Sequence, residues 1–357
     1  MKNVIVFSAF LFCIAANAAT RYVSPTGTDG ENSEGSYENP FATLENAVAK
    51  AAAEDEIVLM KGTHFAKVTL NKKLTIRGET GNRDDVIIRS TGIPTINFYT
   101  GSDGAIIRDF TIQGADGGTG NQGSAVSFNK PGSIINCRMT QCTCAGGAGS
   151  DSMGAGGVVW VNSNIAATIK DCLFDNNIST TASYGIGLFG NDRYGKAKAM
   201  IYIAGKNSLV ENCIITNNSY VGWYKHGYVL GIRATVSCTI KDCEIAYNTA
   251  HFLDLQPETN PWLLKTDVAG ALCQNINIHD NHYWGVRQNP IACSVKDPNA
   301  TINEVNNGPL YPQSTPEVES RSVSDVESLF AALEAAEPWS EIVLEPGIYI
   351  LNATLDI

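Results

Sequence analysis

The chain has 357 residues, 44% of them hydrophobic, and carries a net charge of −11 from 36 acidic and 25 basic residues. This charge disfavours a nucleic-acid or anionic-membrane partner, because both need clustered Lys and Arg. The first residues are typical of an export signal: Lys2, an apolar run from Val4 to Ala16 that is too short to span a bilayer, and small residues up to Ala18. We predict cleavage near Ala18 or Ala19, so that residues 1–19 form the signal. The mature chain is then expected to be extracellular or at the cell surface, with no membrane insertion.

After the signal, residues 20 to about 42 are rich in Gly, Ser, Asn and Pro and predict an irregular lead-in. An amphipathic helix is predicted from Thr43 to Ala53, with Thr43 as its N-cap. The apolar face of this helix would comprise Leu44, Ala47, Val48 and Ala51. A strand, Ile57-Val58-Leu59, follows.

A short phrase then recurs six times: an apolar residue, two positions later Asp or Asn, then usually Cys, and two positions later another apolar residue. The Asp or Asn positions lie 27, 35, 41, 30 and 33 residues apart, at Asp109, Asn136, Asp171, Asn212, Asp242 and Asn275. A constant unit with loops of varying length is typical of a solenoid. Because Asp and Asn tolerate unusual backbone dihedrals, each phrase predicts two short strands that meet at a corner.

Two columns of side chains are expected to run along this solenoid. Four copies of the phrase place a cysteine at the same inward position, at Cys137, Cys172, Cys213 and Cys243. We interpret these as small buried residues stacked on one another, since disulfide geometry needs side chains that point at each other. A second corner is predicted to carry an asparagine ladder at Asn177, Asn218, Asn248 and Asn281. Nine cysteines remain after cleavage, and the sequence leaves any disulfide pairing open.

These features resemble right-handed parallel β-helix proteins of the pectate-lyase-like superfamily over roughly residues 20 to 300. The segment from Cys172 to Asn177, with the preceding Gly156-Gly157-Val158-Val159, is similar to the repeats of chlamydial polymorphic outer-membrane proteins. The resemblance implies an all-β, right-handed parallel β-helix (a solenoid) with an N-terminal α-helical cap. The helix at 43–53 would lie across the open end of the first coil and protect its strand edges.

The end of the chain repeats its beginning. Residues 329–347 match residues 44–62 at an offset of 285, most clearly where Glu341-Ile342-Val343-Leu344 matches Glu56-Ile57-Val58-Leu59. Residues 297–322 have the Pro-rich composition of a linker. We therefore predict a β-helix at 20–296, a linker at 297–322 and the start of a second, truncated β-helix unit at 323–357, which would make the chain a fragment of a longer protein. Alternatively, the last helix and strand dock onto the first solenoid as its own cap.

Candidate site residues follow when the coils are aligned on the asparagine corner. Val221, His251 and Trp284 then share a register, and alternation places later residues of each coil on one outer face. The predicted catalytic residues on that face are Tyr224, His226, Asp254 and Arg287. The predicted substrate-binding residues are Trp223, His251, Gln256, Trp262, Trp284 and Asn289, several of them aromatic side chains on which sugar rings could stack.

These residue types fit the elimination chemistry of an acidic polysaccharide lyase. Arg287 could neutralise a uronate carboxylate, His226 could remove the α-proton, and Tyr224 could protonate the leaving oxygen. Asp254 could orient Arg287 or bind Ca²⁺, although an exposed Asp254–Arg287 ion pair without function is the alternative. Hydrolysis is less favoured, because it needs a pair of carboxylates, and only Asp254 with Glu258 or Asp267 could supply one.

The known catalytic signatures of the superfamily are mostly missing, so the favoured function is not catalytic. We predict a monomeric, secreted or cell-surface β-helix module that binds a polysaccharide, a surface glycan or a host or matrix surface along its long face. A polysaccharide lyase acting on a uronate-containing polymer is the second hypothesis.

Overall fold

The computed structural model describes the chain in nine stretches, residues 18–117, 123–145, 157–180, 199–222, 229–252, 262–284, 292–309, 320–334 and 341–345. Within them the chain forms two compact units, divided between Pro309 and Leu310. No helix in these stretches is long and apolar enough to cross a membrane.

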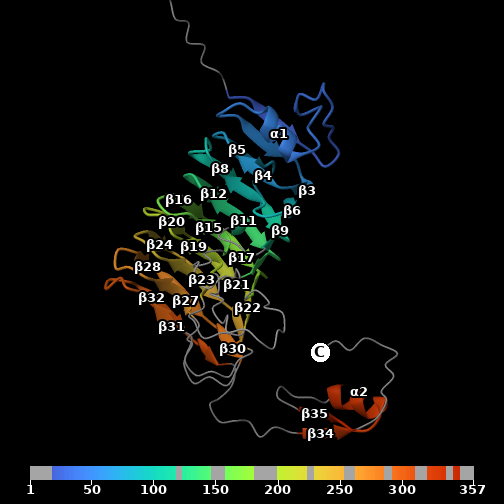
Figure 1. Ribbon diagram of the computed structural model, residues 1–357, viewed down its shortest axis with the longest axis vertical. Helices are drawn as coiled ribbons and strands as arrows, with labels where there is room; N and C mark the ends of the chain where they lie inside the picture. The colour runs from blue at the N-terminus through green and yellow to red at the C-terminus, as the bar shows by residue number, and fades with distance from the viewer. Residues whose placement is uncertain are drawn as a thin grey trace, which may run out of the picture. The chain divides into compact units, whose positions relative to one another are not determined.

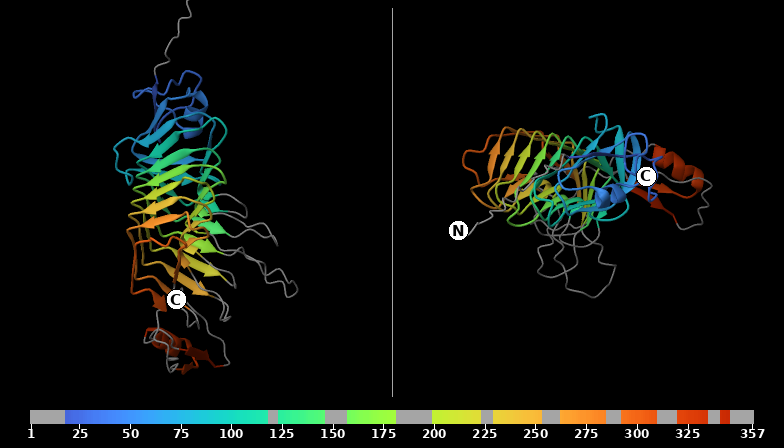
Figure 2. Two further views of the ribbon diagram at one scale, coloured as in Figure 1. Left: turned by 90° about the vertical axis from the view of Figure 1, so that its left-hand side faces the viewer. Right: turned by 90° about the horizontal axis from the view of Figure 1, so that it is seen from above.

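The first unit is built from four sheets, and every strand pairing that they contain is parallel (Figures 1 and 2). Sheet A has the order β1 (Thr20–Val23), β2 (Glu56–Leu59), β5 (Thr75–Gly78), β8 (Ala105–Arg108), β12 (Gly132–Ile135), β16 (Ala167–Lys170), β20 (Leu209–Glu211), β24 (Thr239–Lys241) and β28 (Leu272–Gln274). Sheet B has the order β3 (Gly62–Ala66), β6 (Val86–Ser90), β9 (Thr111–Gln113), β13 (Arg138–Thr140), β17 (Leu173–Asp175), β21 (Ile214–Thr216), β25 (Glu244–Ala246), β29 (Ile276–His279) and β32 (Ile302–Val305).

The other two sheets contribute the remaining strands of the coils. Sheet C has the order β4 (Val68–Leu70), β7 (Ile96–Phe98), β11 (Gly123–Phe128), β15 (Gly157–Val161), β19 (Ile201–Ile203), β23 (Val229–Ala234), β27 (Trp262–Thr266) and β31 (Ala292–Ser294). Sheet D has the order β10 (Asp116–Gly117), β14 (Thr143–Ala145), β18 (Ile178–Thr180), β22 (Ser219–Gly222), β26 (Thr249–Phe252), β30 (His282–Trp284) and β33 (Gly308–Pro309). The coils that begin at β2 and β5 pass through sheets A, B and C, and those from β8 onward pass through the sheets in the order A, B, D, C. The predicted parallel β-helix is thereby confirmed.

The recurring phrase forms the corner between sheets A and B, as predicted. Its Asp or Asn has a positive φ in all six copies, between 49° and 64°. Side chains of neighbouring copies are joined there: the Nδ2 group of Asn136 donates to Asp109 at 2.7 Å, and that of Asn212 donates to Asp171 at 2.7 Å. Short polar residues are favoured at this corner because they both tolerate the left-handed backbone and bond to the next coil.

The predicted cysteine and asparagine columns are also confirmed. The side chains of Cys137, Cys172, Cys213 and Cys243 are free thiols in the core, between the apolar residues of the two flanking strands. The asparagine ladder is fully buried at Asn177, Asn218, Asn248 and Asn281. It continues one coil further than predicted, because Asn307 accepts from both the backbone N–H and the Nδ2 group of Asn281.

The predicted N-terminal helix is present but shorter. Helix α1 spans Leu44–Lys50, and the hydroxyl of its N-cap Thr43 accepts from the backbone N–H of Asn46. It ends early because Ala51 takes an extended conformation, with φ −66° and ψ 147°. Its apolar face lies against β1 to β4. That this helix caps the solenoid stays a prediction.

The solenoid extends beyond its predicted end at residue 296. Strand β32 pairs with β29 and β33 pairs with β30, so residues 302–309 belong to the last coil and not to a linker. The reason is that Asn306-Asn307 repeats the asparagine corner, while Pro309 is tolerated because β33 is an edge strand.

The second unit has the same order of elements as the beginning of the first. Strand β34 (Ser320–Val323) pairs in parallel with β35 (Glu341–Leu344), and helix α2 (Val326–Glu334) connects them. Val323, Leu329 and Ala332 form its small core. In the first unit, β1, α1 and β2 are arranged in the same way. The start of a second β-helix stays a prediction.

Candidate functional site

Most of the predicted site lies outside the described residues. This applies to the four predicted catalytic residues, Tyr224, His226, Asp254 and Arg287, and to the predicted substrate-binding residues Trp223, Gln256 and Asn289.

For the other three predicted residues, the structure describes the backbone. His251 in β26 pairs with Val221 in β22 and with Trp284 in β30, which is the predicted register. Trp262 lies in β27 of sheet C, so it belongs to a different sheet from His251 and Trp284.

A column of aromatic and cationic residues runs along the outer face of sheet C, and the sequence did not reveal it. The register places Trp160 of β15 beside Tyr202 of β19, Tyr202 beside Arg233 of β23, and Arg233 beside Lys265 of β27. The residues before and after each of them point into the core and are fully buried, for example Val159 and Val161. Alternation along a strand therefore puts all four on the outer side of the solenoid. We call these four residues the sheet C column.

Burial varies along the sheet C column. Trp160 and Tyr202 are only 8% and 6% exposed, although they point away from the solenoid interior. The side chains of Arg233 and Lys265 are more open, at 20% and 22%. The guanidinium of Arg233 lies over the ring of Tyr202, 5.6 Å from its centroid, in a cation–π contact. The cationic end of the column is thus the more accessible one.

Among the described residues, a carboxylate pairs with this cationic end. Asp267, two residues after Lys265, accepts from Arg233 at 3.1 Å and lies 3.9 Å from the Nζ atom of Lys265. Burial and repulsion from Arg233 and Lys296 lower the pKa of Lys265, while Asp267 opposes the shift. Burial raises the pKa of Tyr202, and the nearby Arg233 works against this shift. Among the described residues, Arg233 and Lys265 both pair with Asp267, and Lys296 lies near enough to act on Lys265.

Two polar atoms of the column are buried without a hydrogen-bond partner among the described residues, Nε1 of Trp160 and Nε of Arg233. Both are donors. Buried donors in native proteins nearly always have an acceptor, from the protein, from water or from a ligand. Because both atoms are buried, they are not open to a ligand on the outer face.

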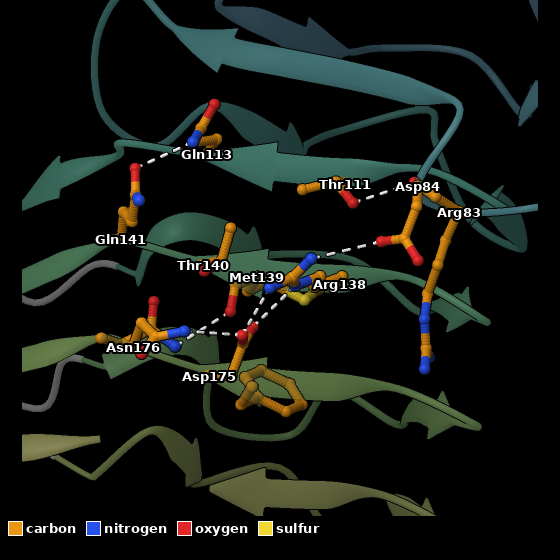
Figure 3. A network of polar contacts seen from close by, with 12 residues as sticks. Arg83, Asp84, Thr111, Gln113, Arg138, Met139, Thr140, Gln141, Asp175 and Asn176 are labelled. Carbon is orange, nitrogen blue, oxygen red and sulfur yellow. Dashed lines mark hydrogen bonds and ion pairs between the residues drawn. The ribbon is translucent and has the colours of Figure 1, made fainter. Parts of the chain in front are cut away.

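A second polar cluster lies on the outer face of sheet B, where the loop between β5 and β6 crosses three further coils (Figure 3). Arg138 binds Asp175 through two hydrogen bonds, at 2.8 and 2.6 Å, and reaches Asp84 of the loop at 3.3 Å. The backbone carbonyl of Arg83 accepts from Thr111 at 2.9 Å, and the Arg83 guanidinium donates to the carbonyl of Asp171 at 3.0 Å. The groups of this cluster satisfy one another, so we assign it a structural role and call the loop the 81–84 strap.

The described stretches contain no group of three or more His, Cys, Asp or Glu side chains that could hold a metal ion. Asp267 faces two cations, which is a poor setting for the Ca²⁺ that the sequence left open, because Ca²⁺ needs several oxygen ligands. Asp254, the predicted Ca²⁺ ligand, lies outside the described residues.

The alignment of the sheet C column could not be predicted from the sequence, because the loops beside it differ in length from coil to coil. Counting back from the recurring phrase, Trp160 precedes Ile169 by nine residues, whereas Arg233 precedes Ile240 by seven. The only local signal is a strand-like alternation with one large polar or aromatic residue between apolar ones, as in Val159-Trp160-Val161 and Ile201-Tyr202-Ile203.

No protein-family model and no curated protein sequence matches the chain. Among solved structures, it is similar to a rhamnogalacturonan lyase, with 13% identity, a TM-score of 0.34 and coverage of 95% of this chain and 89% of that one. It is also similar to pectate lyase Pel9A, with 10% identity, a TM-score of 0.32 and coverage of 84% and 78%. A PL6 family polysaccharide lyase from Pseudopedobacter saltans shares 12% identity at a TM-score of 0.26, with coverage of 87% and 91%. All three are parallel β-helix proteins, the class to which the all-parallel sheets assign the fold of this chain. The likeness to chlamydial polymorphic outer-membrane proteins stays a prediction.

Proposed function

We propose that this chain is an exported, non-catalytic β-helix module that binds an acidic polysaccharide, or an acidic glycan of a host or matrix surface, along the outer face of sheet C. The observation that carries the proposal is the sheet C column, in which Arg233 and Lys265 continue the line of Trp160 and Tyr202 across adjacent strands.

The ligand class follows from the chemistry of this column. A chain with a net charge of −11 would repel a polyanion unless it offers a local cationic surface, and Arg233, Lys265 and Lys296 supply cations there. A guanidinium binds carboxylates and sulfates through several donors in a fixed geometry. Successive coils lie about 4.8 Å apart, so the column would follow an extended polymer.

Binding can be tested by calorimetry with a uronate-containing polysaccharide and with neutral dextran. The acidic polymer should bind, and its affinity should fall as salt is raised. The variant R233A should weaken binding about 10-fold or more, since a hydrogen bond to a charged group contributes about 1.5–3 kcal/mol. R89A is the matched control, because Arg89 is exposed on the outer face of sheet B. Equal affinity of R233A and the unchanged chain, or equal binding of dextran, would contradict the proposal.

A lyase is the second candidate, and the lowered pKa of Lys265 favours it. An amine with a lowered pKa is more often unprotonated, so Lys265 could remove the α-proton of a uronate while Arg233 neutralises the carboxylate. Tyr202, whose pKa burial raises, would keep its proton for the leaving glycosidic oxygen. A hydrolase is less favoured, because hydrolysis needs a pair of carboxylates and, among the described residues, ion pairs link the sheet C column to Asp267 alone.

The two candidates differ in their products. A lyase would generate ultraviolet absorbance from unsaturated uronate, at a rate that rises with pH as Lys265 loses its proton. K265A should then abolish the absorbance while the polymer still binds. K241A is the control, because Lys241 pairs with Glu211 on sheet A. Polymer binding without new absorbance at any pH would leave the binding module as the function.

A further inference from the structure

The carboxylate of Asp55 lies at the beginning of the first coil and is almost completely buried, with 2% of the residue exposed. It accepts three hydrogen bonds from described residues: from the backbone N–H of Ala19 at 2.8 Å, from the backbone N–H of Ala52 at 2.8 Å and from Nε of Arg21 at 3.0 Å. Burial alone would raise its pKa, but these donors outweigh that effect and lower it. Asp55 is therefore a buried anion whose cationic partner among the described residues is Arg21.

The donor from Ala19 lies beside the predicted cleavage site. The small residues Ala16-Asn17-Ala18 end the export signal, and Ala19 directly follows them. The backbone of Ala19 is fixed from both sides, since its carbonyl accepts from Glu56 at 2.9 Å where β1 joins β2. If the chain were cut after Ala18, the nitrogen that now donates to Asp55 would become the α-amino group. A cut after Ala19 would instead remove both contacts.

The internal copy of this segment provides a natural comparison. At equivalent positions, Arg321 of β34 pairs with Ile342 as Arg21 pairs with Ile57. The offset of 285 residues places Ser340 at the position of Asp55. The copy thus keeps the arginine but lacks the carboxylate, and it lies about 300 residues after the predicted cleavage site. Pairing with Arg21 therefore does not by itself explain why a carboxylate stands at position 55.

We propose that cleavage between Ala18 and Ala19 creates a terminal ammonium that binds Asp55 and locks β1 onto the first coil. Hydrolysis by a peptidase breaks the Ala18–Ala19 amide bond, and water supplies a hydroxyl to the carbonyl carbon of Ala18 and a proton to the nitrogen of Ala19. The free amine takes a further proton from solvent, since an α-amino group has a pKa of about 7.7–8.0. The hydrogen bond at 2.8 Å from a neutral amide to the buried carboxylate then becomes an ion pair with a positively charged donor.

Two measurements test this proposal on the whole chain. First, intact-mass analysis of the exported protein should find Ala19 as its first residue; a protein that begins at any other residue overturns the proposal. Second, the mature chain is released from a removable fusion partner so that it begins at Ala19, and its Tm is compared with that of the same chain after N-terminal acetylation. Acetylation should lower the Tm by about 1–3 °C at pH 7.

The contribution of Asp55 is isolated by a double-mutant cycle. In D55N, acetylation should change the Tm little, whereas in E54Q it should have its full effect, because Glu54 is exposed and pairs with Lys73. An equal effect of acetylation in D55N and in the unchanged chain would overturn the proposal. The pH dependence provides a readout that needs no variant. Pairing raises the folded pKa of the amine, so its stabilisation is complete below the unfolded pKa and is lost as the pH rises through the folded pKa. A difference between the free and acetylated chains that persists unchanged to pH 11 would also contradict the ion pair.

Discussion

The side-chain oxygen of Asn248 accepts two hydrogen bonds from Asn218, one from its backbone N–H at 3.0 Å and one from its Nδ2 group at 2.9 Å. Both residues are fully buried. The same pair of bonds joins Asn177 to Asn218 and Asn248 to Asn281. Each amide thus satisfies a corner N–H of the preceding coil that has no partner in the strands.

Replacing Asn218 by Ala should destabilise the solenoid by about 3 kcal/mol. The change removes the acceptor of the Asn177 backbone N–H and leaves that donor buried without a partner, at about 1–3 kcal/mol for each such group. Urea unfolding followed by circular dichroism measures the loss. N217G is the control, because Asn217 is exposed and has a φ of 52° that Gly adopts freely. Similar midpoints for both variants would mean that the ladder contributes little.

Breaking the Arg138–Asp175 pair should destabilise the coils beneath the 81–84 strap. R138M leaves the Asp175 carboxylate, whose side chain is only 8% exposed, without its guanidinium partner. The expected cost is about 2–3 kcal/mol in urea unfolding, since an unpaired buried charge is unfavourable. The double variant R138M/D175N should recover most of this loss. No recovery in the double variant would show that packing of the Arg138 stem, and not its charge, matters.

His64 should make the first coil sensitive to acid. It faces the core in register with Ile88, and its Nε2 group donates to the carbonyl of Met60 at 2.8 Å. Burial lowers its pKa below the ordinary value of 6.5. The unfolded chain therefore binds this proton more readily than the folded chain, so the His64 contribution to stability is lost as the pH falls below about 6.5. Comparing Tm between pH 8 and pH 5 for the unchanged chain and H64L measures the effect. Parallel curves for the two would refute it.

The core thiols should resist alkylation until the chain unfolds. Burial raises the pKa of Cys142 to about 12 and raises the pKa values of Cys137 and Cys213. Because the thiolate is the reactive form, iodoacetamide at pH 7.5 should modify these residues in urea but not in the native chain. Peptide mapping by mass spectrometry without reductant reports both states. Disulfide-linked peptides that join any two of these cysteines would contradict the buried thiol column.

The corners were the most predictable part of the fold, because they depend on side chains that lie close together in sequence. The phrase around Asp171, Cys172 and Phe174 fixes a left-handed residue, an inward thiol and an inward ring within four positions. Once the corners are aligned, the strands that follow at a fixed distance are aligned too. For this reason the pairing of His251 with Trp284 was predicted correctly.

The end of the solenoid and the sheet C column were not predictable in this way. Strand β32 places Glu304 in register with the core residue Ile278. The sequence of the last coil therefore lacks the apolar residue by which the repeat is recognised. The Asp55 contacts likewise join residues that lie 34 and 36 positions apart in the chain.

The amino-acid sequence by itself determined that the chain coils, where its corners lie and which small residues stack inside, because these features rest on local backbone preferences and on a repeated pattern. Only the tertiary structure decided that Trp160, Tyr202, Arg233 and Lys265 stand in one line. The loops before that line differ in length, so its register is set by the hydrogen bonds between coils and by the packing of the core, and not by any spacing along the chain.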